Sequence, residues 1–145
     1  MNHNQELGQI GEEIAGDYLA KNGYRILHRN WNLHRGCELD LVAMKNNELH
    51  FIEVKTRAKA NDYTGRPEEA VNKRKLINIQ RAIAYYTSYY HLNNEMHIDV
   101  IGIVYRNDND YDINFMPDVS YYEMSYSYHG RGRRQFHEYV QGPVS

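Results

Sequence analysis

The sequence has few of the residues that build covalent or membrane-spanning frameworks. Cys37 is the single cysteine among 145 residues, which excludes an internal disulfide and a cysteine-based zinc site. The eight histidines include no pair four residues apart beside a glutamate, so we expect no histidine-based zinc site either. The best apolar run, residues 100–104, is far shorter than the roughly 20 residues of a membrane helix. The first residues lack the basic start and apolar stretch of a secretory signal, and we therefore expect a cytoplasmic protein without a membrane partner.

Charge of either sign is unevenly distributed, although the net charge is only −2. Residues 55–81 hold eight Lys/Arg against three acidic residues, whereas residues 82–130 hold one against seven. Because phosphate binding depends on the local field and not on the total charge, the basic stretch makes nucleic acid a candidate partner. A solvated helix face is the alternative, and for a charge run alone it is the commoner explanation.

Hydrophobic periodicity predicts the order helix, three strands, helix, two strands. The predicted helices span residues 4–22 and from just after Pro67 to residue 90, and the predicted strands span residues 24–31, 38–44, 49–57, 98–105 and 111–116. Asn46-Asn47 predicts a tight turn that joins the second and third strands as a hairpin. The fourth strand is apolar on both faces and is expected to be central. This order predicts an α/β fold with a mixed central sheet flanked by helices.

The composition divides the chain into two parts. Residues 1–117 have the length and balance of one domain with a single core. Residues 118–145 are rich in tyrosine and arginine and are expected to form an appendage. Tyrosines interleaved with arginines suit base stacking and phosphate pairing, and an interaction segment for another protein is the alternative.

Two predicted neighbouring strands carry charged residues within apolar segments. Side chains alternate along a strand, so Glu38, Asp40 and Val42 are expected on one face of the second strand, opposite Leu39 and Leu41. On the third strand, Glu53 and Lys55 are expected to share a face with Phe51, opposite Ile52. Strands about 4.8 Å apart would let Asp40 and Glu53 reach one ion.

Two carboxylates at that distance repel each other, and a divalent cation removes the repulsion. Mg²⁺ (or Mn²⁺) suits hard oxygen ligands, and the backbone carbonyl of Val54 is a further candidate ligand. Lys55 would hold a water molecule or neutralise charge on a phosphate. Glu12, at the edge of the apolar face of the first helix, is a third candidate carboxylate. The alternatives are a surface ion pair on the strands and, for Glu12, a residue favoured only by the helix dipole.

The sequence also resembles a known family, the YraN-like uncharacterised bacterial proteins. The resemblance covers about residues 6 to 116 and rests on Gly11-Glu12-x-x-Ala15-x-x-Tyr18-Leu19, Asn30-Trp31, Glu38-Leu39-Asp40-Leu41-Val42-Ala43, Phe51-Ile52-Glu53-Val54-Lys55-Thr56-Arg57, and Lys73 to Lys75 with Ala82 and Tyr86. That family is similar to Holliday-junction resolvases and other nucleases of the PD-(D/E)xK fold. The resemblance implies a restriction-endonuclease-like core, with Asp40, Glu53 and Lys55 as catalytic residues and Glu12 as the acid carried by the helix.

A basic rim follows these residues in the sequence and is the predicted phosphate-binding surface. It consists of Arg57, Lys59, Arg66, Lys73, Arg74 and Lys75. The leading hypothesis is a metal-dependent endonuclease acting on DNA, which we favour over RNA, with branched DNA as one candidate substrate. A non-catalytic nucleic-acid-binding protein and a protein-interaction module that uses the tyrosine-rich tail are the alternatives. Because resolvase-like enzymes act as dimers, the resemblance also suggests a homodimer.

Overall fold

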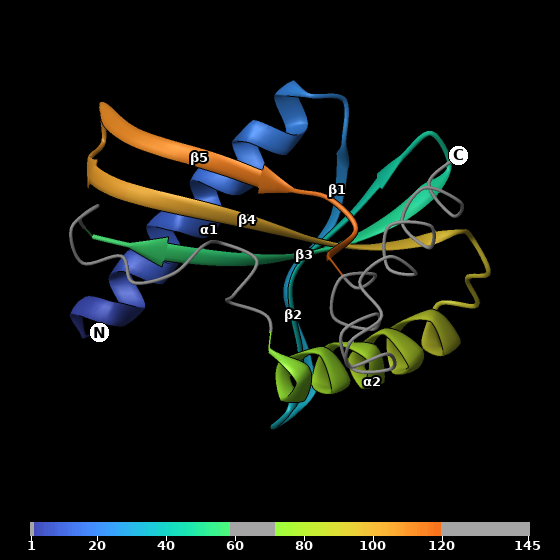
Figure 1. The fold of residues 1–145 in the computed structure, drawn as a ribbon. Coiled ribbons are helices and arrows are strands. Elements are labelled where there is room, and N and C mark those ends of the chain that lie inside the picture. The colour runs from blue at the N-terminus through green and yellow to red at the C-terminus, as the bar shows by residue number, and fades with distance from the viewer. Residues whose placement is uncertain (1, 59–71, 120–145) are drawn as a thin grey trace, which may run out of the picture.

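The computed structural model describes residues 2–58 and 72–119. In chain order the elements are α1 (His3–Lys21), β1 (Arg25–His34), β2 (Cys37–Lys45), β3 (Glu48–Arg57), α2 (Lys73–Tyr89), β4 (Met96–Asn107) and β5 (Asp110–Met116). The five strands form one sheet in the order β1-β2-β3-β4-β5. Only β3 and β4 are parallel, and the other neighbours are antiparallel, so the sheet is mixed. The two helices lie on different sides of this sheet (Figure 1).

Each helix covers one face and encloses one part of the core. The cluster under α1 contains Ala15, Leu19, Leu41, Ala43, Ile52, Ile101 and Ile103. The cluster under α2 contains Cys37, Leu39, Val42, Leu49, Phe51, Leu76, Ile79, Ala82, Tyr86, Ile98, Val100 and Val119. Neighbouring residues of β4, Val100 and Ile101, belong to different clusters, which is the pattern of a strand buried on both faces. The fold is thus α/β with a mixed sheet flanked by helices, and is compatible with a restriction-endonuclease-like core.

The predicted elements are confirmed, with differences at their ends. Gly23 has a φ of 89° and follows the end of α1, as expected for a left-handed stop. Asn46 and Asn47 both have positive φ, which suits the tight turn between β2 and β3. The second helix begins at Lys73 and not just after Pro67, because the side chain of Asn72 accepts a hydrogen bond from the Lys75 amide and caps the helix there.

The strand prediction fails at one point, where β1 and β2 bend. Leu39 was expected on the same face as Leu41, but Leu39 packs under α2 and Leu41 under α1. On the neighbouring strand, Asn30 has a φ of 52°, a left-handed conformation that breaks regular alternation. The regular pairing of β2 with β3 also ends at Leu41 and Ile52. Asp40 therefore lies where the sheet opens between β2 and β3.

The C-terminal end of the described residues bears on the predicted division into domains. Asp118 and Val119 were assigned to the appendage, yet Val119 is buried in the cluster under α2. The rest of the predicted appendage, residues 120–145, lies outside the described residues.

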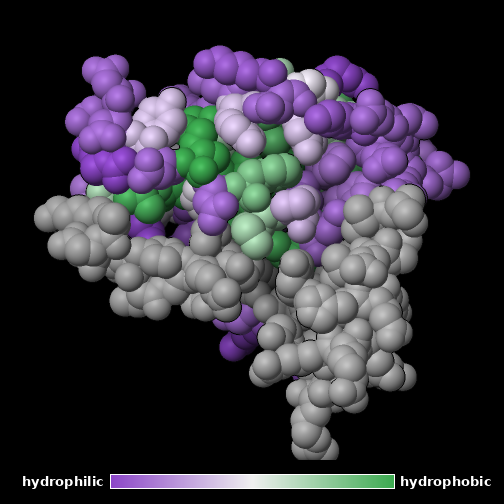
Figure 2. Space-filling view, turned by 45° about the horizontal axis from the view of Figure 1, so that its top comes forward, coloured by the Kyte–Doolittle hydropathy of each residue, from purple (hydrophilic) through white to green (hydrophobic). Residues whose placement is uncertain are grey.

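Within the described residues no helix is both long enough and apolar enough to cross a membrane. On the face that Figure 2 shows, hydrophobic side chains occupy a central area between hydrophilic margins.

The closest approach between α1 and the sheet occurs at Gly11, next to the candidate site residue Glu12. A Cβ atom at Gly11 would overlap Oγ1 of Thr56 in β3, whereas a Cβ atom at Gly8 would meet nothing within 4 Å. Gly11→Ala should therefore lower the free energy of unfolding by roughly 1–3 kcal/mol through overpacking. The matched variant Gly8→Ala should raise it by up to about 1 kcal/mol through helix propensity. Urea unfolding measures both, and equal effects would show that α1 does not pack as described.

Candidate metal centre

Asp40 takes the place of a strand partner for β3. Its Oδ2 accepts a hydrogen bond from the Val54 amide at 2.9 Å. The regular pairing of β2 with β3 ends at Leu41, the residue after Asp40, so the carboxylate satisfies an amide that has no strand carbonyl opposite it. This contact fixes the Asp40 side chain beside the middle of β3.

Glu53 lies next to Asp40 and faces α2. Its side chain is only 11% exposed, and Oε1 lies 2.9 Å from Nζ of Lys75 in the first turn of α2. Burial, followed by the negative charge of Asp40, raises the pKa of Glu53 to about 7, although Lys75 acts in the opposite direction. The Glu53 and Asp40 carboxyl groups are also within hydrogen-bonding reach of one another. Glu53 therefore holds a proton more readily than an ordinary glutamate.

Asp40 is subject to the same forces. Burial raises its pKa above the ordinary value, while the hydrogen bond from Val54 and the charge of Lys75 limit the increase. Burial works against a charge on Lys75, but the nearby Glu53 and Asp40 outweigh that effect and raise the lysine pKa. In this structure Lys75 is thus the cation that compensates the carboxyl pair.

Glu12 reaches the same region from α1. It is half-buried, and burial followed by the charge of Asp40 raises its pKa, while a hydrogen bond with Asn30 lowers it. Glu12 also lines an open cavity with Gln9, Glu13, Arg29 and Asn30. The expected position of Glu12 at the edge of the apolar face is therefore confirmed, and Glu13 beside it is exposed.

Lys55 lies two residues after Glu53 in β3 and is exposed. The expected shared face is consistent with the packing, because Phe51 lies under α2 and Ile52 under α1. Since both backbone polar groups of a strand residue point the same way, the Val54 carbonyl is expected to face the gap toward which its amide points.

The predicted basic rim divides into three groups. Lys73 and Arg74 are exposed at the start of α2. Lys75 was predicted to belong to the phosphate-binding rim, but in the structure it forms an ion pair with Glu53. Arg57 is partly buried at the end of β3, and Lys59 and Arg66 lie outside the described residues.

The structure brings together residues that sequence reasoning did not connect. Lys75 was assigned to the rim from its charge, and its contact with Glu53 depends on how α2 packs across β2 and β3. The left-handed conformation of Asn30 could have been suspected from its residue type, because asparagine tolerates a positive φ better than most residues do. A separate cluster of Glu48, His50 and His97 was also missed, because its two histidines lie on strands that are far apart in the sequence.

Asp40 and Glu53 could hold a metal ion between them, and Glu12 lies near Asp40 on the side of α1; we call these three acids the carboxylate centre. Burial raises the pKa of all three acids, and the charge of Asp40 further raises the pKa of Glu12 and Glu53. Carboxylate oxygens with one backbone carbonyl form a hard donor set of the kind that Mg²⁺ prefers. The arrangement therefore suits a divalent cation better than it suits an ordinary surface ion pair.

The raised pKa of Glu53 predicts a pH-dependent stability in metal-free buffer. A carboxyl group that binds its proton more tightly in the folded state stabilises the fold fully below about pH 4.5, and this stabilisation is lost as the pH rises through about 7. Glu53→Gln mimics the protonated form. Its melting temperature should therefore rise relative to wild type between pH 5 and pH 8, by about 3 °C for each kcal/mol.

Glu13→Gln is the matched control for this measurement, because Glu13 is exposed and lies away from the pair. Its melting temperature should keep a constant difference from wild type over the same pH range. A constant difference for Glu53→Gln as well would contradict the described burial of Glu53 beside Asp40.

Comparison with known proteins identifies relatives that share most of this chain. A UPF0102 protein of Syntrophomonas wolfei is 46% identical over 102 residues, covering 70% of this chain and 86% of the relative. A UPF0102 protein of Bacteroides thetaiotaomicron is 40% identical over 109 residues, covering 75% and 88%. Another from Clostridium acetobutylicum is 40% identical over 118 residues, covering 80% and 94%.

A family model described as Uncharacterised protein family UPF0102 matches residues 11–103. This range includes every residue of the carboxylate centre, the whole of α2 and the part of α1 from Gly11 onward. The resemblance noted in the sequence is thus confirmed at the level of the family. The chain belongs to the UPF0102 family.

Proposed function

We propose that the protein is a Mg²⁺-dependent endonuclease that hydrolyses phosphodiester bonds in DNA. The observation that carries this proposal is the pair of largely buried carboxyl groups, Asp40 and Glu53, held side by side at an opening in the sheet. Buried acids with incomplete charge compensation are costly, and such perturbed groups concentrate at functional sites.

The residues present fit the proposed metal. Asp40 and Glu53 would hold Mg²⁺ together with the Val54 carbonyl, and Glu12 would approach from α1. When bound, Mg²⁺ supplies a Lewis acid that polarises the phosphate and lowers the pKa of a water molecule. Mn²⁺ has similar ligand preferences and should substitute for it.

The two lysines would have different tasks. Lys55 is exposed on the strand that carries Glu53, so it is accessible to a substrate and could neutralise charge that develops on the phosphate. Lys75 compensates the charge of the carboxyl pair in the structure. Entry of a divalent cation would release Lys75 from that role and leave its ammonium group free to contact the DNA backbone.

The start of α2 provides the proposed phosphate-binding surface. Lys73, Arg74 and Lys75 occupy its first turn, and no acidic residue is present there. Positive charge at a helix N-terminus is unfavourable by roughly 0.3–1 kcal/mol per residue, since it opposes the helix dipole. A bound phosphate removes this conflict, because the free amides and the cations then act on the same anion.

A cleavage assay tests the catalytic proposal. The full chain is incubated with linear, single-stranded and four-way-junction DNA in Mg²⁺, in Mn²⁺ and in EDTA. We expect cleavage only with a divalent cation, its loss in Asp40→Asn and Glu53→Gln, and a decrease of at least about 100-fold in Lys55→Ala. Glu13→Gln and Lys21→Ala, which change exposed residues on α1, should cleave like wild type.

Cleavage that survives Asp40→Asn and Glu53→Gln would refute the carboxylate centre as the active site. DNA binding by the wild type without cleavage in either metal would favour a non-catalytic nucleic-acid-binding protein of the same fold. Comparing the cleavage rates of four-way-junction and linear DNA tests whether the resemblance of the family to resolvases extends to the choice of substrate.

DNA binding at several salt concentrations tests the surface at α2. Replacing Lys73 and Arg74 together with alanine should weaken binding and reduce the slope of log K against log salt by about 2, one for each lost phosphate contact. Arg25→Ala, at an exposed position at the start of β1, is the control and should leave the slope unchanged. An unaltered slope in the double variant would exclude this end of α2 from the interface.

A further inference from the structure

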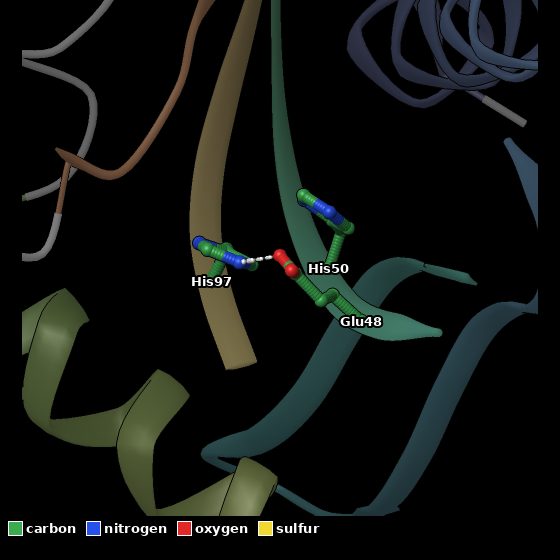
Figure 3. Close-up of side chains that lie close together, drawn as sticks. All are labelled: Glu48, His50 and His97. Carbon is green, nitrogen blue, oxygen red and sulfur yellow. Dashed lines mark hydrogen bonds and ion pairs between the residues drawn. The ribbon is translucent and has the colours of Figure 1, made fainter. Parts of the chain in front are cut away.

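A second cluster of metal-ligating side chains lies at the start of β3 and β4. It consists of Glu48 and His50 from β3 and His97 from β4, and we call it the histidine cluster. The three side chains come from adjacent strands and lie close together (Figure 3). Glu53 shares a strand with His50 but faces α2, so this cluster lies on the other face of the sheet from Glu53.

Each side chain of the cluster offers one ligand atom, and the three atoms all lie within 4.8 Å of one another. His97 Nε2 lies 2.6 Å from Glu48 Oε1, and the His50 and His97 rings are stacked with centroids 4.6 Å apart. Tetrahedral zinc with bonds of about 2.0–2.1 Å places its ligands about 3.4 Å apart. Binding would therefore move His97 Nε2 and Glu48 Oε1 apart by somewhat less than an ångström and bring the more distant ligand atoms closer together. All three side chains are only partly buried, so such small movements are possible.

Two further carboxylates hold the imidazoles in place. Nδ1 of His50 lies 2.7 Å from Oδ2 of Asp99, which is fully buried. Nδ1 of His97 lies 2.6 Å from Oδ1 of Asp118, and the Asp118 amide donates to Asp99 at 2.9 Å. A histidine that donates its Nδ1 hydrogen to a carboxylate has a fixed orientation and presents Nε2 as a lone-pair donor, as in most zinc sites.

We propose that Glu48, His50 and His97 bind a Zn²⁺ ion. Two imidazoles with one carboxylate suit a borderline metal such as Zn²⁺ and are a poor match for Mg²⁺. Glu95, whose carboxylate lies 3.5 Å from His97 Nε2, offers a fourth ligand, and a water molecule is the other candidate. The ion would replace the proton shared by His97 and Glu48, and that proton would pass to solvent.

The proposed ion would join segments that are distant in the chain. Glu48 and His50 begin β3 directly after the turn from β2, and His97 begins β4 after α2. Through Asp118 the same network reaches the segment that follows β5. Zinc bound here would therefore link the strands at one end of the sheet. It should raise the free energy of unfolding by an amount that grows with the zinc concentration relative to its dissociation constant.

Titration of the full, metal-free chain with Zn²⁺ and with Co²⁺ tests the proposal. Calorimetry should show binding at this cluster, and the Co²⁺ complex should have the visible absorption of a tetrahedral ion. His50→Gln and His97→Gln should each lower the affinity for Zn²⁺ by more than about 100-fold. Asp118→Asn, which removes only an orienting carboxylate, should lower it by about 10–100-fold. His34→Gln, at an exposed histidine on β1, should bind like wild type.

The circular dichroism spectrum of each variant shows whether it is folded, and zinc-dependent shifts of melting temperature provide a second readout. Zinc should raise the melting temperature of wild type and of the double variant Asp40→Asn, Glu53→Gln, and should not raise that of His97→Gln. Zinc affinity that is unchanged in both histidine variants would overturn the proposal. Zinc binding lost only in the Asp40, Glu53 variant would assign the ion to the carboxylate centre and would overturn it equally.

Discussion

The hydrogen bond from the Val54 amide to Asp40 is the contact on which the carboxylate centre depends. The pairing of β2 with β3 ends at Leu41 and Ile52, so a carboxylate and not a strand carbonyl satisfies the next amide of β3. This substitution holds Asp40 beside Glu53 at the opening of the sheet. The raised pKa of Glu53 and its ion pair with Lys75 follow from this contact, because two largely buried acids at this distance repel each other and favour a compensating charge.

The sheet carries two different sets of ligands at two separate places. At the carboxylate centre the donors are hard oxygens, and the neighbouring cations belong to α2. At the histidine cluster the donors are two imidazoles and one carboxylate, oriented by Asp99 and Asp118. Ligand chemistry alone should therefore direct different metals to the two places. We propose that the first set serves catalysis and that the second set stabilises one end of the sheet.

Much of the architecture could be predicted from local patterns. The period of the apolar residues identified both helices and all five strands, and Asn46-Asn47 identified the hairpin. The proximity of Asp40 and Glu53 also followed, since antiparallel neighbours joined by a tight turn have a nearly fixed register. The face of the sheet on which Leu39 lies could not be predicted from the sequence. The left-handed conformation of Asn30 on the neighbouring strand bends the paired strands and interrupts the alternation of their side chains.

The sequence by itself determined which residue types stand in phase on neighbouring strands, and so it determined the fold class and the acids of the carboxylate centre. Only the tertiary structure decided that Lys75 pairs with Glu53 and that His50 meets His97, because these contacts join elements that are distant in the chain. The period of a strand or helix is local and specifies which face a residue occupies. Which helix lies over that face, and which strand lies parallel beside it, depends on how the whole chain buries its apolar surface.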